Sequence, residues 1–342
     1  MRKLATFRDI TDIIPIPDAD SIECAIVDGG WQVVVRKGNY QKGDHVIFIE
    51  IDSWVPTEIA PFLSKGKEPK EYNGVKGERL RTVKLRKQIS QGLILSCHEY
   101  PQVNSCGKDD DLSEVLGIIK WEPEIPANLR GKIIGNFPSF IPKTDQERVQ
   151  NLSFEIAQWN NNKETWEVTE KLDGSSMTVY FHNDVFGVCS RNFDLAMEEG
   201  NSFWRVAINK NLETTLKEMC AYYGKSLALQ GELVGPGIQK NLYALSDLDF
   251  FVFDIYDINS GSYIPSNMRL NLIKMFNLNS VPVFAPITFD GNMDITSLLR
   301  LAEDKSLLNN KSEREGLVFK NMNHPNISFK AISNKFLLKN EG

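Results

Sequence analysis

The sequence predicts an α+β protein in which a β-rich first third precedes a remainder of mixed strands and helices. Before residue 100, short β-branched and apolar runs follow one another without a long helical pattern. From residue 166 onward, strand-like runs alternate with amphipathic helical patterns. At 342 residues, with 42% hydrophobic and 25% charged residues, the chain is long enough for roughly two domains.

The first third is a series of strand-like runs separated by loops rich in glycine, proline, asparagine and aspartate. Strands of this number and length are typical of a small β-barrel. An OB-type barrel fits the size, although a generic barrel or sandwich fits the spacing equally well. We therefore expect an OB-type β-barrel domain over residues 1–120. Its strands are expected over residues 1–14, 22–27, 31–36, 45–51, 79–85 and 92–98.

A basic segment lies near the end of this region. Such a run is more often a solvated surface than a binding surface, but aromatic residues nearby, such as Trp54 and Tyr72, offer platforms on which bases can stack. The net charge of -6 argues weakly against a protein coated with nucleic acid, yet it does not exclude a local basic channel. The segment consists of Lys76, Arg79, Arg81, Lys84, Arg86 and Lys87.

Proline and glycine recur between Glu122 and Pro142, so residues 121–145 are expected to connect two domains. Thr144, followed three residues later by Glu147, has the pattern of a capping box and predicts a helix start. Residues 146–342 are expected to form a second domain of antiparallel sheets flanked by helices. Its helices are expected over residues 201–223, 267–276 and 295–303, and its strands over 166–170, 176–182, 185–190, 227–234, 249–257, 316–320 and 327–332.

Composition excludes several classes of protein. No stretch approaches the length of a membrane span and the N-terminus lacks a signal-peptide core, so we expect an intracellular protein that does not associate with membranes. The five cysteines are odd in number and far apart, which is typical of buried thiols in a reducing compartment. Neither a nucleophile–histidine pairing nor a Walker-type phosphate loop is present.

The candidate chemistry centres on Lys171, in the run Glu170-Lys171-Leu172-Asp173-Gly174. A Lys-x-Asp-Gly match alone would arise by chance in about one chain in ten of this length, so its companions decide. A lysine amine attacks phosphorus when it is deprotonated, held beside the phosphate and assisted by positive charge. Acids and lysines suited to this chemistry lie at the edges of later strands: Glu232, Asp254, Asp257, Glu315, Lys320 and Lys330.

Several of these acids converging with lysines would outline a metal–phosphate site, because magnesium prefers few carboxylates, many waters and bridging phosphates. Lys320 and Lys330 are expected to bind a phosphate and to depress the pKa of Lys171 by like-charge repulsion. Taken alone, Lys320 has the pattern of a surface lysine on a strand.

The ordered set of motifs resembles motifs I, Ia, III, IIIa, IV and V of the covalent nucleotidyltransferases, which include ATP-dependent DNA and RNA ligases and messenger-RNA capping enzymes. The β-rich region comes first and the chain ends soon after Lys330, an arrangement similar to nick-sealing RNA ligases with an N-terminal OB domain, the Naegleria-type enzyme in particular. Ser176, where DNA ligases have arginine, also favours the RNA branch. The motifs are Lys171-Leu172-Asp173-Gly174, Ser190-Arg191-Asn192, Gly231-Glu232-Leu233, Phe253-Asp254, Glu315-Gly316-Leu317-Val318 and Phe329-Lys330.

The resemblance implies an ATP-dependent ligase and gives each matched residue a role. Lys171 would attack the α-phosphorus of ATP and form a lysyl-AMP intermediate, releasing pyrophosphate. Lys330, together with Lys320, would bind the α-phosphate. The metal, Mg²⁺ or Mn²⁺, would be held through waters by Asp173, Glu232 and Glu315. The nucleotide would be contacted by Glu170 in the adenine pocket, Phe253 stacked on adenine, Arg191 at the ribose or α-phosphate, Arg148 at the pyrophosphate end, and by Glu232 and Lys330.

The resemblance also implies a substrate. AMP would pass to a 5′-phosphate end, and the adjoining 3′-hydroxyl would attack it to form a phosphodiester. We expect a monomer that acts on a nicked duplex with RNA at the 3′-hydroxyl end. The alternatives are a DNA ligase or a guanylyltransferase of the same superfamily, and a nucleic-acid-binding protein without catalytic activity.

Overall fold

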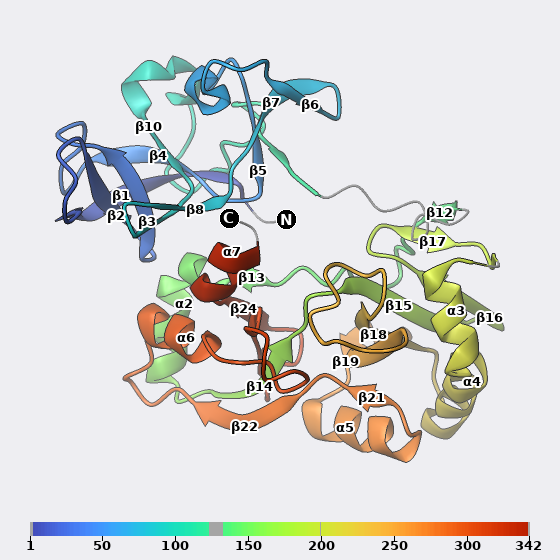
Figure 1. Cartoon of the computed structure of the whole chain (residues 1–342). Helices are drawn as coiled ribbons and strands as arrows, with labels where there is room; N and C mark the ends of the chain where they lie inside the picture. Colours follow the sequence, from blue (N-terminus) through green and yellow to red (C-terminus); the bar gives the residue numbers. More distant parts are fainter. Residues whose placement is uncertain (1–2, 123–132, 199, 341–342) are drawn as a thin grey trace. The chain divides into compact units, whose positions relative to one another are not determined.

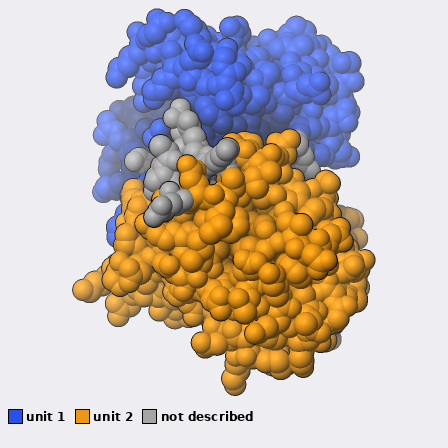
Figure 2. All heavy atoms as spheres, turned by 90° about the vertical axis from the view of Figure 1, so that its right-hand side faces the viewer, with its two compact units in different colours: residues 1–124, 337–342 blue, residues 125–336 orange. Residues whose placement is uncertain are grey.

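The structure, a computed structural model, describes residues 3–122, 133–198 and 200–340. Two compact units are present, residues 1–124 with 337–342 and residues 125–336 (Figure 1). Figure 2 distinguishes these units in a space-filling view. Residues 123–132 of the expected connector lie outside the described residues. Within the described part of the chain, no helix is long and apolar enough to cross a membrane.

An antiparallel sheet in the order β10-β4-β1-β2-β3 forms the first part of unit 1 (Figure 1). A register shift between Ile10 and Asp12 divides the long strand β1, whose first half pairs with β4 and whose second half pairs with β2. Such a bulge bends a strand, as a barrel requires. The strands are β1 (Ala5–Pro15), β2 (Ile22–Val27), β3 (Trp31–Arg36), β4 (His45–Ile49) and β10 (Leu93–Ser96).

A second sheet of unit 1 has the order β11-β5-β7-β6, and β8 and β9 form a separate hairpin. The expected strand over residues 79–85 is thus divided, because Leu80 turns into the core of unit 1. These strands are β5 (Ser53–Pro56), β6 (Lys70–Tyr72), β7 (Val75–Arg79), β8 (Thr82–Leu85), β9 (Gln88–Gln91) and β11 (Ile119–Lys120). Short 3₁₀ helices η1 (Pro61–Ser64), η2 (Cys97–Glu99) and η3 (Pro101–Val103) complete the unit.

The larger sheet of unit 2 has the order β12-β17-β16-β15-β18-β19-β20, and β21 pairs with β19. One core joins this sheet to α3, α4 and α5 (Figure 1). Its strands are β12 (Ile133–Asn136), β15 (Ser175–His182), β16 (Val185–Cys189), β17 (Phe193–Leu195), β18 (Leu227–Val234), β19 (Asp249–Asp257), β20 (Ser262–Tyr263) and β21 (Asn279–Ser280). The helices are α3 (Ser202–Asn209), α4 (Leu212–Tyr223) and α5 (Ser266–Met275).

The smaller sheet of unit 2 has the order β13-β24-β23-β14-β22, and its core includes residues of α2 and α6. Its strands are β13 (Glu147–Arg148), β14 (Thr165–Lys171), β22 (Val283–Thr288), β23 (Gly316–Asn321) and β24 (Ser328–Ile332). The helical segments are η4 (Val149–Asn151), α2 (Ser153–Asn161), α6 (Ile295–Ala302) and α7 (Asn334–Asn340), the last of which crosses from unit 2 into unit 1.

Two expected helices differ from the structure. The helix start at Thr144 is wrong, because residues 147–148 form β13, which pairs in parallel with β24, and α2 begins later. The single helix expected over residues 201–223 is two helices, because Asn211 has a left-handed φ of 53° that ends the first before the second begins. Sheet pairing overrides the local sequence pattern in the first case. A single backbone angle overrides it in the second case.

Candidate active site

Lys171 is the last residue of β14, where its backbone pairs with Gly316 of β23. Glu315 immediately precedes β23, so the strand pairing places its carboxylate beside the lysine amine. Lys171 Nζ donates to both carboxylate oxygens of Glu315, at 2.7 Å each. The Lys171 side chain remains 26% exposed, which leaves the amine open to a substrate.

Gly174 explains why the lysine motif ends in glycine. A Cβ at this position would lie 2.4 Å from the backbone oxygen of Leu233 and 2.8 Å from Glu232 Cγ, so a side chain does not fit. The backbone amide of Gly174 also donates a hydrogen bond to Glu232. This close approach brings the lysine motif against β18, the strand that carries Glu232.

Glu232 and Asp173 add two carboxyl groups near Lys171. Burial, together with Glu315 and Asp173, raises the pKa of Glu232 to about 8, although Lys171 opposes the shift. The Asp173 backbone amide donates to the hydroxyl of Tyr243 at 2.5 Å, which fixes the turn after the lysine. The site therefore contains three carboxylates around one amine.

The expectation that Lys320 and Lys330 depress the pKa of Lys171 is wrong. Burial does lower the pKa of Lys171, but Glu315, Glu232 and Asp173 together outweigh burial and raise it above its ordinary value. The field at the amine is thus set by acids, and any positive charge that favours the neutral amine has to come from a bound group.

Lys320 lies apart from Lys171 in a buried charge cluster. Its backbone pairs with Glu167, four residues before Lys171, which places it about 13 Å along the strand. Lys320 Nζ contacts Asp254 Oδ1, and Lys320 is only 4% exposed. The interpretation of Lys320 as a surface lysine is therefore also wrong, because the larger sheet of unit 2 covers this part of β23.

The cluster holds two acids and two bases among the described residues. Arg269 Nη2 donates to Glu167 Oε1 at 2.5 Å, and Arg269 Nη1 lies 3.5 Å from Asp254 Oδ1. Ser266 Oγ donates to the other oxygen of Glu167 at 2.8 Å. These side chains connect β14 and β23 of the smaller sheet to β19 and α5, so the cluster joins the two sheets of unit 2.

A bulge in β19 at Phe253 orients the residue that follows it, Asp254. Gln230 pairs with Asp254 and Gly231 pairs with Val252, so Phe253 has no partner on β18. Phe253 packs in the apolar cluster of Phe251, Leu172 and Tyr243, as alternation along the strand requires. The extra residue then changes the alternation, and Asp254 reaches Lys320.

Glu170 points to the opposite face of β14 from Lys171. Its Oε2 accepts a hydrogen bond from the Leu307 backbone amide at 2.8 Å. Burial raises the pKa of Glu170, although Ser306, Leu307 and Arg314 oppose the shift. Glu170 Oε1 is buried without a hydrogen-bond partner among the described residues, so it can still accept from a donor.

Three further basic residues predicted to contact the nucleotide lie at different depths. Arg148 on β13 is buried and pairs in register with Lys330 on β24, which is half-buried. Lys330 also pairs with Val318 on β23, the strand that lies between β24 and β14. Arg191 lies nearer solvent and donates to Asp145 Oδ1 at 2.8 Å.

A metal ion would have to be held through water at this site. Among the described residues, no group of three His, Cys, Asp or Glu side chains is arranged to bind a metal directly. Glu315 is also bonded through both oxygens to Lys171. The converging carboxylates nevertheless suit Mg²⁺, which usually keeps several of its waters.

Sequence analysis missed Tyr243, Asp145, Glu167 and Arg269. Tyr243 and Asp145 lie in loops and Arg269 in α5, and their spacing to the motifs carries no signal. Glu167 offers a weak signal, because it lies on the same face of β14 as Lys171 and a buried acid within a strand is unusual.

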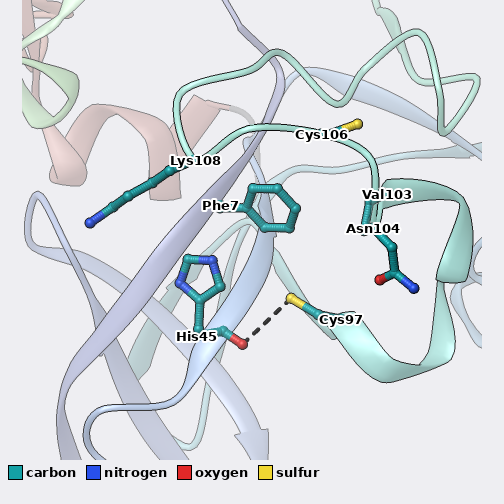
Figure 3. A pocket seen from close by; sticks show the side chains of 7 residues that line it. All are labelled: Phe7, His45, Cys97, Val103, Asn104, Cys106 and Lys108. Atoms are coloured by element: carbon teal, nitrogen blue, oxygen red, sulfur yellow. Dashed lines mark hydrogen bonds between the residues drawn. The ribbon is translucent and has the colours of Figure 1, made fainter.

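Unit 1 contains a separate hollow of about 330 Å³, drawn in Figure 3. The ring of His45 stacks on Phe7 with centroids 5.1 Å apart, and Cys97 Sγ contacts the His45 carbonyl oxygen (Figure 3). His45 Nδ1 lies 2.7 Å from Asp9 Oδ1. The hollow is lined by none of the residues predicted for catalysis.

Known protein families and solved structures match most of the chain. The sequence profile of RNA ligases matches residues 164–333, and a profile of an OB-fold domain matches residues 4–97. A Naegleria gruberi RNA ligase variant solved with AMP and Mn is similar at a TM-score of 0.91 and 43% identity, over 99% of this chain and 99% of that chain. A variant of the same enzyme with ATP and Mn has a TM-score of 0.90, 43% identity and the same coverage.

The Naegleria gruberi enzyme with PPi is similar at a TM-score of 0.90 and 44% identity, over 100% of this chain and 99% of that chain. Comparison with curated proteins gave no match. These similarities confirm the predicted fold class, an OB-type domain followed by a nucleotidyltransferase domain. They also confirm the resemblance to RNA ligases with an N-terminal OB domain.

Proposed function

Since this chain belongs to the RNA ligase family and is an ATP-dependent RNA ligase, we propose that it seals 3′-hydroxyl/5′-phosphate nicks through a lysyl-AMP intermediate. The observation that carries this proposal is the site around Lys171, where Glu315 holds the amine at 2.7 Å and Asp173 and Glu232 lie close by. Motifs I, III and IV contribute these residues.

In the first step, the Lys171 amine attacks the α-phosphorus of ATP. A phosphorus–nitrogen bond forms, the bond to pyrophosphate breaks, and the amine loses its proton. Glu315 orients the amine, and the raised pKa of Lys171 means that the amine is protonated until positive charge arrives. Asp173, Glu232 and Glu315 would hold a divalent cation, Mg²⁺ or Mn²⁺, through waters, and its charge would stabilise the phosphate oxygens and favour the neutral amine.

The adenosine is bound beside Lys171. Phe253, which packs in the apolar cluster of Leu172, stacks on adenine. Glu170 lines the adenine pocket, where its unpartnered Oε1 can accept a hydrogen bond from the nucleotide. Burial keeps these contacts away from water, and a hydrogen bond is stronger in the protein interior than in water.

The phosphates are bound by cations from β24, from β13 and from the loop after β16. Lys330 binds the α-phosphate, Arg148 binds the pyrophosphate end, and Arg191 contacts the ribose or α-phosphate. Pairing of Arg148 with Lys330 across β13 and β24 places these two cations side by side, which suits adjacent phosphates. Lys320 is left out of this set because its amine contacts Asp254 in the buried cluster.

The first experiment tests the covalent step. The protein is incubated with Mg²⁺ and ATP labelled at the α-phosphate, and label attached to the protein is measured after denaturing electrophoresis. We expect labelling by α-labelled but not γ-labelled ATP, and none for Lys171→Met. Equal labelling of Lys171→Met would overturn the assignment of the nucleophile, and labelling by GTP instead would indicate a guanylyltransferase.

The second experiment tests the substrate. We propose a monomer that acts on a nicked duplex with RNA at the 3′-hydroxyl end, with residues 1–120 as barrel domain, 121–145 as connector and 146–342 as catalytic domain. Matched nicks with ribonucleotides or deoxyribonucleotides at the 3′ end are sealed in parallel. Equal rates on both would contradict the RNA preference and indicate a DNA ligase.

A further inference from the structure

The basic segment of unit 1 divides into a neutralised part and a free part. Lys76 Nζ lies 3.1 Å from Glu68 Oε1, and Arg79 Nη2 lies 2.7 Å from Asp52 Oδ1. The next four cations are all exposed, and none has an acidic partner within the described part of the chain. They are Arg81, Lys84, Arg86 and Lys87.

The free cations lie on the β8–β9 hairpin and the residue before it. Strands β8 and β9 pair from Thr82–Gln91 to Leu85–Gln88, which leaves Arg86 and Lys87 as a two-residue turn. Both have left-handed φ angles, 48° and 69°. A turn of this kind favours Asn-Gly, because most side chains are strained there. Two cations at these positions are therefore not explained by the needs of the turn.

Strand β9 of the hairpin is fixed to the sheet of unit 1. The Val34 backbone amide donates to Ser90 Oγ at 3.0 Å, and Gln88 Nε2, next to the turn, donates to Gln32 Oε1 at 2.6 Å. These contacts attach β9 to the edge strand β3. The cations at the turn are thus presented by an anchored strand, which reduces the ordering cost of a contact.

The hairpin surface is apolar and basic, without acids. Val83 and Leu85 are 39% and 44% exposed, and residues 80–91 contain no aspartate or glutamate. In a chain with a net charge of -6, such a concentration of unpaired cations is a local exception. Cations of this arrangement attract phosphates, while the small apolar side chains can contact sugars.

We propose that the β8–β9 hairpin is an arm that binds the phosphate backbone of the duplex substrate through Arg81, Lys84, Arg86 and Lys87. This inference rests on the proposed ligase function and names the part of the OB-type domain that holds the nucleic acid. Binding is independent of base sequence, because phosphate contacts carry no sequence information.

The test exploits the strained turn. Arg86→Asn with Lys87→Gly removes two charges and installs the residues that the turn favours, so the variant should melt at the same or a higher temperature. Its affinity for a fluorescent nicked duplex, measured without divalent metal, should fall roughly three- to tenfold at low salt. The slope of log affinity against log salt should decrease in magnitude by about two, one for each lost phosphate contact.

Lys37→Gln with Lys42→Gln is the matched control. Both lysines are exposed, and their replacement removes two positive charges, as the turn variant does. They follow the C-terminal end of β3, whereas Gln32, which Gln88 contacts, lies near its start. The control should keep the wild-type affinity and salt slope. Arg81→Gln with Lys84→Gln provides a second hairpin variant that leaves the turn intact, and it should weaken binding as the turn variant does.

The hairpin inference is overturned if both hairpin variants bind as wild type does, or if the control loses as much affinity. Self-adenylylation by α-labelled ATP is measured on all proteins and should be unchanged. Absence of labelling in the wild type, with binding that still depends on the hairpin, would refute the proposed function and not the arm. Normal labelling with hairpin-independent binding would refute the arm alone.

Discussion

Two lysines on the same pair of strands in unit 2 have opposite surroundings. Lys171, at the end of β14, is 26% exposed and faces Glu315, Glu232 and Asp173. Lys320, on the neighbouring β23, is buried against Asp254, and Arg269 balances the remaining charge of Glu167. Each lysine contacts one carboxylate closely, yet their environments differ in net charge and in access to solvent.

The difference indicates that one sheet carries both a candidate catalytic site and a charge cluster that stabilises the fold. An open site with excess negative charge can take up a cation and, with it, the phosphates of a nucleotide. A closed cluster with balanced charge has no such capacity, and removal of one member leaves an uncompensated charge in a buried place. We therefore expect Lys171 to control activity and Lys320 to control stability.

The largest effect is expected from Lys171→Met. Self-adenylylation should be abolished, because the nucleophile is removed, while the free energy of unfolding should change by about 1 kcal/mol or less, as for a partly exposed ion pair. Labelling with α-labelled ATP and denaturant unfolding measure the two quantities. A variant that keeps its label, or one that loses most of its stability, would break the comparison.

Lys320→Met should have the reverse profile. It leaves Asp254 buried without its lysine, and breaking a buried pair in this way costs about 3–5 kcal/mol. At temperatures well below its melting transition the variant should still label with ATP. The double variant Lys320→Met with Asp254→Leu should regain part of the stability. Complete loss of labelling in the folded single variant would instead place Lys320 at the phosphate.

Gly174→Ala sharpens the comparison at the open site. Its Cβ would lie 2.4 Å from the Leu233 oxygen, so we expect a loss of about 1–3 kcal/mol in stability together with slower self-adenylylation. Gly135→Ala is the control, because a Cβ there meets nothing within 4 Å. Thermal unfolding and the rate of labelling report both effects. An unaffected Gly174→Ala variant would show that the backbone can separate without consequence for the lysine.

The smallest effect is expected from a third lysine pair, Lys225 with Asp257, at 2.7 Å. Burial raises the pKa of Asp257, but hydrogen bonds from Lys225 and Ser260 outweigh it and hold the pKa below its usual value. A depressed pKa contributes stability above the ordinary carboxyl pKa that is lost as pH falls through the folded value. The stability difference between wild type and Lys225→Met should therefore narrow in acid. If the stability difference between the two proteins were constant with pH, the pair of Lys225 and Asp257 would be excluded as a source of pH-dependent stability.

Sequence reasoning predicted most strands of both units. The expected runs at residues 22–27, 31–36, 227–234 and 249–257 coincide with β2, β3, β18 and β19. These strands have strong local composition, so their neighbours in sequence are sufficient to identify them. Short strands such as β13 and β21 were missed because two residues carry no periodic signal and are held by pairing alone.

The candidate site was predicted as a set of residues, but the relations among them were not. The sequence pointed to Lys171, Glu315, Glu232 and Asp173, which the structure brings together. It gave Lys320 the same status as Lys330, because both are lysines on late strands. Their positions along the sheet, which separate them, depend on register with β14 and on the covering strand β19.

By itself the sequence determined the class of fold, the order of the motifs and the candidate nucleophile, because composition and spacing are properties of short segments. The tertiary structure alone decided which lysine meets which acid, how the bulge at Phe253 orients Asp254, and which cations of the basic segment remain free. These outcomes depend on contacts between residues far apart in the chain, where strand register and burial set the balance of charges.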